Sequence, residues 1–295
     1  MYDPFTKLNK LKEKRNAVIL AHYYQDPDIQ DVADFLGDSL ALAQAAQKTD
    51  ADVILFCGVH FMAETAKILN PEKTVLIPDV EAGCSLADSA PPDEFEKWVN
   101  KYSDHTVISY INCSAQVKAL SDVICTSSNA EKILNSLPAN EKIIFAPDQL
   151  LGGYLMKKTG RNLRLWHGTC QVHEMFSERE LVRLKIRYPN AKVLAHPECT
   201  EAILQHADII GSTTKIINYA AESDDDIFLI ATEPGVIHQM ELKVPSKKYI
   251  PVPNQEGCAC NECPYMRLNT IDKMIYSLTN NTHEITMSES LRNSA

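Results

Sequence analysis

A pattern that the sequence repeats three times limits what this chain can fold into. Short apolar runs end at polar residues, and the residues that close the first run of each copy, His22, Tyr110 and His196, stand 88 and 86 positions apart. A fixed period of about 87 residues predicts a repeated domain. Each copy holds three such runs with helical spacing between them. That order is typical of parallel strands that are buried on both faces and joined by helices.

In the first copy, the runs at residues 17–21, 52–58 and 74–77 are predicted strands, and residues 29–47 are predicted to be helical. Each copy then reads strand–helix–strand–helix–strand. We therefore predict an α/β fold of three pseudo-symmetric, three-layer α/β/α domains with small parallel sheets. We expect them to form a triangle around a central site. The expected boundaries are 1–92 with an N-terminal helix, 93–178, and 179–295 with a C-terminal helix.

More polar residues recur at fixed offsets from the three strand ends. Two positions after the strand ends stand Tyr24, Asn112 and Glu198, and seventeen positions after the same strand ends stand Ser39, Ser127 and Thr213. Near the end of each copy stands a cysteine: Cys84, Cys170 and Cys263. In open α/β sheets, ligands bind outside the carboxyl ends of the strands. If these ends face one another, the recurring residues converge on one cavity.

Composition and motifs exclude several classes of function. The net charge is −10 and no basic stretch suits a nucleic-acid backbone. No glycine-rich dinucleotide fingerprint or P-loop is present. The apolar runs are too short to span a bilayer, and the N-terminus lacks the apolar core of a signal peptide. We therefore expect a cytoplasmic protein with mostly reduced cysteines, no nucleic-acid partner and no membrane partner.

Cysteines at matching places in the three copies point to a metal centre. Cys84, Cys170 and one of the late cysteines, at positions 258, 260 and 263, offer three thiolates. A four-iron cluster on three cysteines leaves one iron open as a Lewis acid, which suits dehydration. Alternatively, the late cysteines form a zinc site, or the two earlier cysteines are ordinary buried thiols.

Histidines, tyrosines and one glutamate are candidates for substrate binding and proton transfer. His22, His196 and His173 can donate to carboxylates, although a histidine after a strand is often structural. Tyr24, Tyr110 and Glu198 are candidate proton carriers, and simple packing is the alternative for the tyrosines. We expect an enclosed site to raise the pKa of Glu198 toward working pH. Ser39, Ser127 and Thr213 stand where the first helix of each copy ends or the next loop begins. They are either polar ligands or plain helix caps or turn residues.

The sequence resembles the quinolinate synthase family, the A proteins of the bacterial route to NAD. Motifs from about residue 19 to residue 270 carry the resemblance: ILAHYYQ, DVADFLGDSL, GVHFMAETAKILNP, IPDVEAGCSLAD, TSSNA, FAPDQLLGGYL, WHGTCQVHEMF, AHPECTEAI, ADIIGST and CNECPYMRLNT. The resemblance implies three α/β/α domains around a [4Fe-4S] cluster. It also implies condensation of iminoaspartate (iminosuccinate) with dihydroxyacetone phosphate to quinolinate, with loss of phosphate and two waters.

The resemblance further implies roles for individual residues. The cluster ligands would be Cys84, Cys170 and Cys263, the last because the family ligand shortly precedes a methionine. Substrate-contacting positions are matched by His22, Ser39, Tyr110, Asn112, Ser127, His196, Glu198 and Thr213. Residues near the reacting atoms are matched by Tyr24, His173 and Glu198, with Tyr110 a further catalytic candidate.

Cys258 and Cys260 depart from the C-x-x-C-x-x-C run of some family members, because their gap is one residue shorter. The resemblance therefore assigns no redox role to that pair, and these adjacent thiols either form a disulfide or oxidise without consequence. We expect a monomer that acts on small molecules, and the resemblance suggests transfer of the imine from an aspartate-oxidising enzyme. Two alternatives stay open: another [4Fe-4S]-dependent hydro-lyase, and a non-enzymatic protein that senses metal or redox state.

Overall fold

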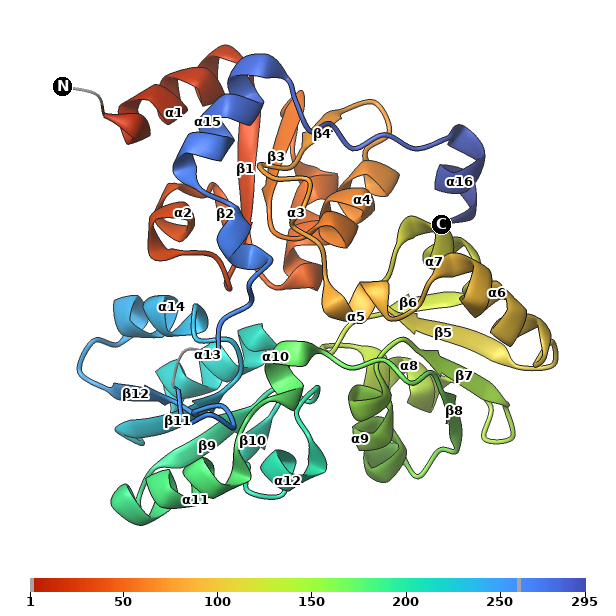
Figure 1. Ribbon diagram of the computed structural model, residues 1–295, viewed down its shortest axis with the longest axis vertical. Helices are drawn as coiled ribbons and strands as arrows, with labels where there is room; N and C mark the ends of the chain where they lie inside the picture. Colours follow the sequence, from red (N-terminus) through yellow and green to blue (C-terminus); the bar gives the residue numbers. More distant parts are fainter. Residues whose placement is uncertain (1–2, 259–260) are drawn as a thin grey trace. The chain divides into compact units, whose positions relative to one another are not determined.

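Three parallel sheets of four strands each form the framework of the computed structural model, which describes residues 3–258 and 261–295. The strand orders are β2-β1-β3-β4, β6-β5-β7-β8 and β10-β9-β11-β12, so the same topology occurs three times (Figure 1). The strands are β1 Ala17–His22, β2 Phe35–Gly37, β3 Val53–Cys57, β4 Thr74–Leu76, β5 Thr106–Tyr110, β6 Val123–Cys125, β7 Ile143–Ala146, β8 Leu163–Leu165, β9 Lys192–Ala195, β10 Ile209–Ile210, β11 Ile227–Ala231 and β12 Lys248–Pro251. The repeated α/β fold and its parallel sheets are thus confirmed, while the triangular arrangement stays a prediction.

Helices separate successive strands. They are α1 Pro4–Lys14, α2 Pro27–Val32, α3 Ser39–Lys48, α4 His60–Leu69, α5 Ser85–Asp88, α6 Pro92–Asn100, α7 Ala115–Ala119, α8 Ala130–Ser136, α9 Gln149–Thr159, α10 Gln171–Glu174, α11 Glu178–Arg187, α12 Glu201–Leu204, α13 Thr213–Glu222, α14 Val236–Lys243, the 3-10 helix η1 Met266–Leu268, α15 Ile271–Asn280 and α16 Glu289–Ser294. None of the helices in the described part of the chain has both the length and the apolar character needed to cross a membrane.

Each sheet has one strand more than the sequence pattern predicts. The edge strands β2, β6 and β10 contain three, three and two residues, too few to form an apolar run. The predicted helix at 29–47 is therefore wrong, because α2, β2 and α3 occupy this stretch.

An aspartate directly before each edge strand ties that strand to its sheet. Its carboxylate accepts the backbone N–H of a residue fifteen positions earlier, at 2.8 Å in every copy. The pairs are Ile19 with Asp34, Val107 with Asp122, and Val193 with Asp208. The repeat thus extends to a side-chain contact that fixes the register of the edge strand.

The chain forms two compact units, and each is described by itself. Unit 1 comprises the residues up to Lys97, Ile111–Ser121 and Pro264–Ala295, and it holds the first sheet. Unit 2 comprises Trp98–Tyr110 and Asp122–Cys263, and it holds the other two sheets.

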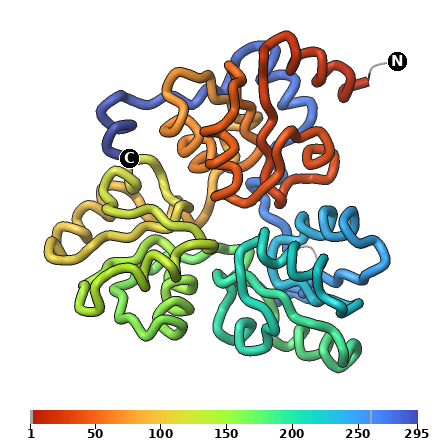
Figure 2. Tube along the Cα trace, turned by 180° about the vertical axis from the view of Figure 1, so that it is seen from behind, coloured from red at the N-terminus to blue at the C-terminus, as the bar shows by residue number. Residues whose placement is uncertain are grey.

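Helix α15, the first α-helix after β12, packs within unit 1. Met274, Ile275 and Leu278 of α15 share a buried cluster with Leu8 of α1 and Ile19 of β1. Figure 2 shows the late chain running beside the first residues of the chain. The helix that the sequence grouped with the third domain therefore lies in the core of the first sheet, and the domain boundaries at 92 and 178 stay a prediction.

Candidate active site

Two equivalent strand ends meet within unit 2. Tyr110 is the last residue of β5, and Glu198 follows β9 by three positions. The Tyr110 hydroxyl donates to Glu198 Oε1 at 2.5 Å, and both side chains are buried. The second and third sheets thus bring their carboxyl ends together around one carboxylate, as expected for ligand sites of parallel sheets.

Two imidazoles surround the same carboxylate. His173 Nδ1 lies 3.0 Å from Glu198 Oε2, and His196 Nδ1 lies 3.5 Å from Oε1. The two rings stack with their centroids 4.7 Å apart. Glu198 is only 2% exposed, so these groups take the place of bulk water around its carboxylate.

The pKa of Glu198 is the reverse of the sequence expectation. Burial alone raises the pKa of this carboxyl, but the positive charges of His196 and His173, with hydrogen bonds from His173 and Tyr110, lower it to about 2. The expectation of a raised pKa was therefore wrong, because it considered burial without the two imidazoles. Glu198 stands ready to accept a proton rather than to give one.

His173 links this carboxylate to a thiol and to a hydroxyl. It lies on the short helix α10, where its Nδ1 is also 3.3 Å from Cys170 Sγ, while Nε2 is 3.0 Å from Thr232 Oγ1. A histidine with both nitrogens engaged has a fixed ring orientation. Thr232 directly follows β11, and this position after an apolar run was the signal that could have identified it.

Ligand atoms of Cys170, His173 and Glu198 all lie within 4.8 Å of one another. A thiolate, an imidazole and a carboxylate are donors that zinc and iron both accept. This donor set therefore fits a metal centre that binds sulfur. Cys263 belongs to the same unit, and its backbone N–H donates to Glu233 Oε1 at 3.4 Å. Cys260 lies outside the described residues.

Asp148 is a second buried carboxyl that the sequence analysis did not select. It follows β7, and its Oδ1 accepts the N–H groups of Leu150 and Leu151 at 2.8 and 2.9 Å, capping α9. Burial and then the negative charge of Glu198 raise the pKa of Asp148 well above its usual value. Two carboxyls in one region thus take opposite protonation states, a pattern typical of catalytic centres.

Two hydroxyl candidates also belong to unit 2. Ser127 follows the edge strand β6, and Thr213 is the first residue of α13, after the edge strand β10. A short strand intervenes between the first helix of each copy and these residues, so Ser127 lies in the turn after β6 and Thr213 begins α13. Their new place is the carboxyl end of an edge strand, on the ligand-binding side of the sheet.

The remaining candidates lie in unit 1. His22 is buried at the end of β1, and its ring packs edge-on against Tyr24 with centroids 4.4 Å apart. Ser39 begins α3, and Cys84 occupies the N-cap position of α5. Asn112 precedes α7, and its Oδ1 is buried without a hydrogen-bond partner in the described part of the chain.

Fold and site together define an α/β protein with a thiolate, an imidazole and a carboxylate at the carboxyl ends of parallel strands. The family described as quinolinate synthetase A protein matches residues 6–295. Three relatives named quinolinate synthase are 59% identical over 291 residues (Gloeothece citriformis), 60% over 290 (Microcystis aeruginosa) and 62% over 291 (Chloroherpeton thalassium). These matches cover 98–99% of this chain and 90–91% of each relative. The chain belongs to the quinolinate synthetase A family and is an enzyme.

Proposed function

We propose that this chain forms quinolinate for NAD biosynthesis by condensing iminoaspartate with dihydroxyacetone phosphate and releasing phosphate and two waters. The observation that carries the proposal is the buried Glu198 ion, which two imidazoles and the Tyr110 phenol hold close to the Cys170 thiol. Condensation and loss of water both require a group that takes up and returns protons near the reacting atoms. The names of the relatives support the choice of product.

The proposed cofactor is a [4Fe-4S] cluster. Its ligands would be Cys84, Cys170 and Cys263, as the family resemblance implies. When bound, the cluster would supply a Lewis acid at the iron that has no protein ligand. The donors Cys170, His173 and Glu198 support a metal in unit 2. The same mixed set is also typical of zinc, which is therefore the second candidate metal.

Proton transfer is assigned to the groups around Glu198. The low pKa of Glu198 keeps it ionised in the resting enzyme, and Tyr110 supplies a hydroxyl at its Oε1. His173 orients the carboxylate through Oε2 while Thr232 holds the other ring nitrogen. Tyr24 is proposed near the reacting atoms from unit 1, where its ring packs on His22.

Substrate binding is assigned to polar groups at the ends of the parallel strands. The imidazoles of His22 and His196 suit carboxylates, and the hydroxyls of Ser39 and Thr213 stand at helix N-termini, which favour phosphate. The full proposed set is His22, Ser39, Tyr110, Asn112, Ser127, His196, Glu198 and Thr213.

Cellular context rests on the family resemblance alone. We propose that the enzyme works as a monomer in the cytoplasm and receives its imine from an aspartate-oxidising enzyme. Gel filtration of the chain alone would test the monomeric state, and gel filtration together with that enzyme would test whether the two proteins associate.

The decisive experiment combines metal content with a product assay on protein purified without oxygen. We expect about four iron and four sulfide per chain and formation of quinolinate from the two substrates, with Cys170→Ala as the inactive control. About one zinc in place of iron would refute the cluster. A full cluster without quinolinate would leave another hydro-lyase as the function.

A further inference from the structure

The loop that carries the late cysteines is fastened to the segment around α10. The Ser177 N–H donates to the Pro253 carbonyl, and the Gln255 N–H donates to the Met175 carbonyl, both at 3.0 Å. Between these two bonds, Asn254 forms an antiparallel bridge with Phe176. All of these residues belong to unit 2. The loop after β12 is therefore a built part of the unit that contains Cys170.

Asn261 makes a second attachment, closer to the cysteine. Its side chain is 6% exposed, and Nδ2 donates to the Val172 carbonyl at 2.6 Å. Val172 stands two residues after Cys170, at the start of α10. A buried amide requires such a partner, because leaving it without a hydrogen bond costs stability. Asn261 thus joins the stretch before Cys263 to the helix after Cys170.

Glu233 makes a third attachment, at the cysteine itself. This side chain is fully buried after β11, and its two oxygens accept the N–H groups of Gly235 at 2.7 Å and Cys263 at 3.4 Å. A buried carboxylate is costly, so its hydrogen bonds matter for the fold of this loop. The preceding residue, Thr232, contacts His173. The end of β11 therefore contacts both Cys263 and the histidine beside Cys170.

We propose that Asn261 and Glu233 are positioning residues that hold Cys263 on the side of Cys170, so that unit 2 presents two thiolates to one metal centre. The proposal deepens the proposed function and rests on its thiolate ligands. It also gives a structural reason to prefer Cys263 over Cys258. The backbone of Cys258 is instead engaged in a local turn, where its N–H donates to Asn254 Oδ1 at 3.1 Å.

Cobalt(II) is a suitable probe, because its thiolate charge-transfer absorption reports the number of bound cysteines. It is titrated into metal-free, full-length protein without oxygen. We expect Cys170→Ala and Cys263→Ala to lose one thiolate each, and Cys258→Ala to match the wild type. Asn261→Ala and Glu233→Ala should weaken cobalt binding about 10-fold or more, as loss of residues that orient ligands typically does. Glu233→Gln, which keeps one oxygen to accept the Cys263 N–H, should recover part of the affinity.

Asn70→Ala is the matched control. Asn70 is also 6% exposed, and its Nδ2 donates to the Ala66 carbonyl at 2.9 Å in unit 1. It should lower the melting temperature as Asn261→Ala does, and leave cobalt binding unchanged. Wild-type cobalt spectra and affinity in both Asn261→Ala and Glu233→Ala would overturn the proposal, as would a wild-type spectrum without two thiolates. If these variants bind cobalt more weakly but the wild type makes no quinolinate, the positioning role is supported and the proposed function is refuted.

Discussion

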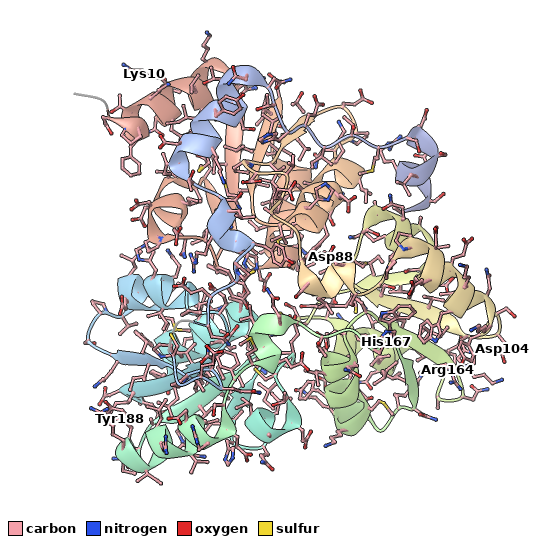
Figure 3. The ribbon with its side chains drawn as sticks, viewed as in Figure 1. Lys10, Asp88, Asp104, Arg164, His167 and Tyr188 are labelled. Atoms are coloured by element: carbon pink, nitrogen blue, oxygen red, sulfur yellow. The ribbon has the colours of Figure 1, made fainter. Side chains whose placement is uncertain are left out.

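The two edges of the parallel sheets in unit 2 carry similar charged groups in opposite surroundings. At the amino-terminal edge, Asp104 precedes β5 and pairs with Lys142 and His105, and its side chain is 60% exposed (Figure 3). At the carboxyl-terminal edge, Glu198 pairs with His173 and His196 where almost no solvent reaches. The pKa of each carboxyl is nevertheless lowered to about 2.

Different causes produce these two similar values. Hydrogen bonds from Lys142 and His105 lower the pKa of Asp104 with little opposition from burial. For Glu198, burial acts first and raises the pKa, and the imidazoles must overcome it. Removing one partner from the exposed pair leaves a hydrated charge, whereas in the buried group it leaves an uncompensated ion. The two edges therefore differ in the burial of their carboxylates and not in the pKa values. We call the edge with Glu198 the functional edge and the edge with Asp104 the solvated edge.

The largest effect is expected from Glu198→Gln. This variant keeps the shape of the side chain but removes the negative charge that accepts the proton. We expect quinolinate formation to fall by about 10²–10⁴-fold, while the metal content stays close to that of the wild type. Steady-state kinetics with metal analysis checks this. Turnover within about threefold of the wild type would remove Glu198 from proton transfer.

The next effect concerns the proposed cluster. Cys170→Ala and Cys84→Ala should each lose most of the iron, because two thiolates hold a four-iron cluster poorly. Cys258→Ala should keep it, since the backbone of Cys258 takes part in the local turn with Asn254. Iron and sulfide analysis after reconstitution without oxygen distinguishes these cases. A full iron content in Cys170→Ala would refute Cys170 as a ligand of the cluster.

Much of the functional edge could be predicted from the sequence, because the repeat places its residues at equal offsets. His22 and Tyr110 are the last residues of β1 and β5, and His196 directly follows β9, as the pattern required. Aspartates also recur twelve positions after them, at 34, 122 and 208, and this offset could have revealed the edge strands. The strands themselves are too short to leave a hydrophobic signal.

Contacts between distant segments were beyond the sequence pattern. The low pKa of Glu198 depends on His173, which lies 25 positions earlier and comes close only through folding. Asp148 and Glu233 follow apolar runs, but only the first run of each copy was compared across the repeat. The placement of 111–121 in unit 1 likewise rests on a tertiary contact, the hydrogen bond from Ala115 N–H to Glu64 Oε2 at 3.0 Å.

A smaller effect should come from Asp148→Asn, and it depends on pH. The unfolded carboxyl ionises near pH 4, whereas the raised pKa keeps Asp148 protonated in the folded protein. The folded wild type then binds more protons than the unfolded chain, so its stability falls as pH rises between the two pKa values. Asparagine caps a helix equally well, and because it does not ionise, the variant does not lose stability in this way as pH rises. The melting temperature of the variant should therefore rise relative to that of the wild type as pH increases above about 4. A difference that does not vary with pH would mean that Asp148 ionises normally.

The same substitution at the other edge should give the smallest effect, with the opposite sign. Because the folded pKa of Asp104 lies below its ordinary value, its stabilisation is present above about pH 4 and is lost as pH falls toward about 2. Asp104→Asn should lower the melting temperature at pH 7 by less than about 2 °C, and salt at about 1 M should remove most of the difference. Thermal unfolding at low and high salt checks this. A larger, salt-insensitive loss would mean that the solvated edge supports the fold as strongly as the buried edge, so that burial no longer separates them.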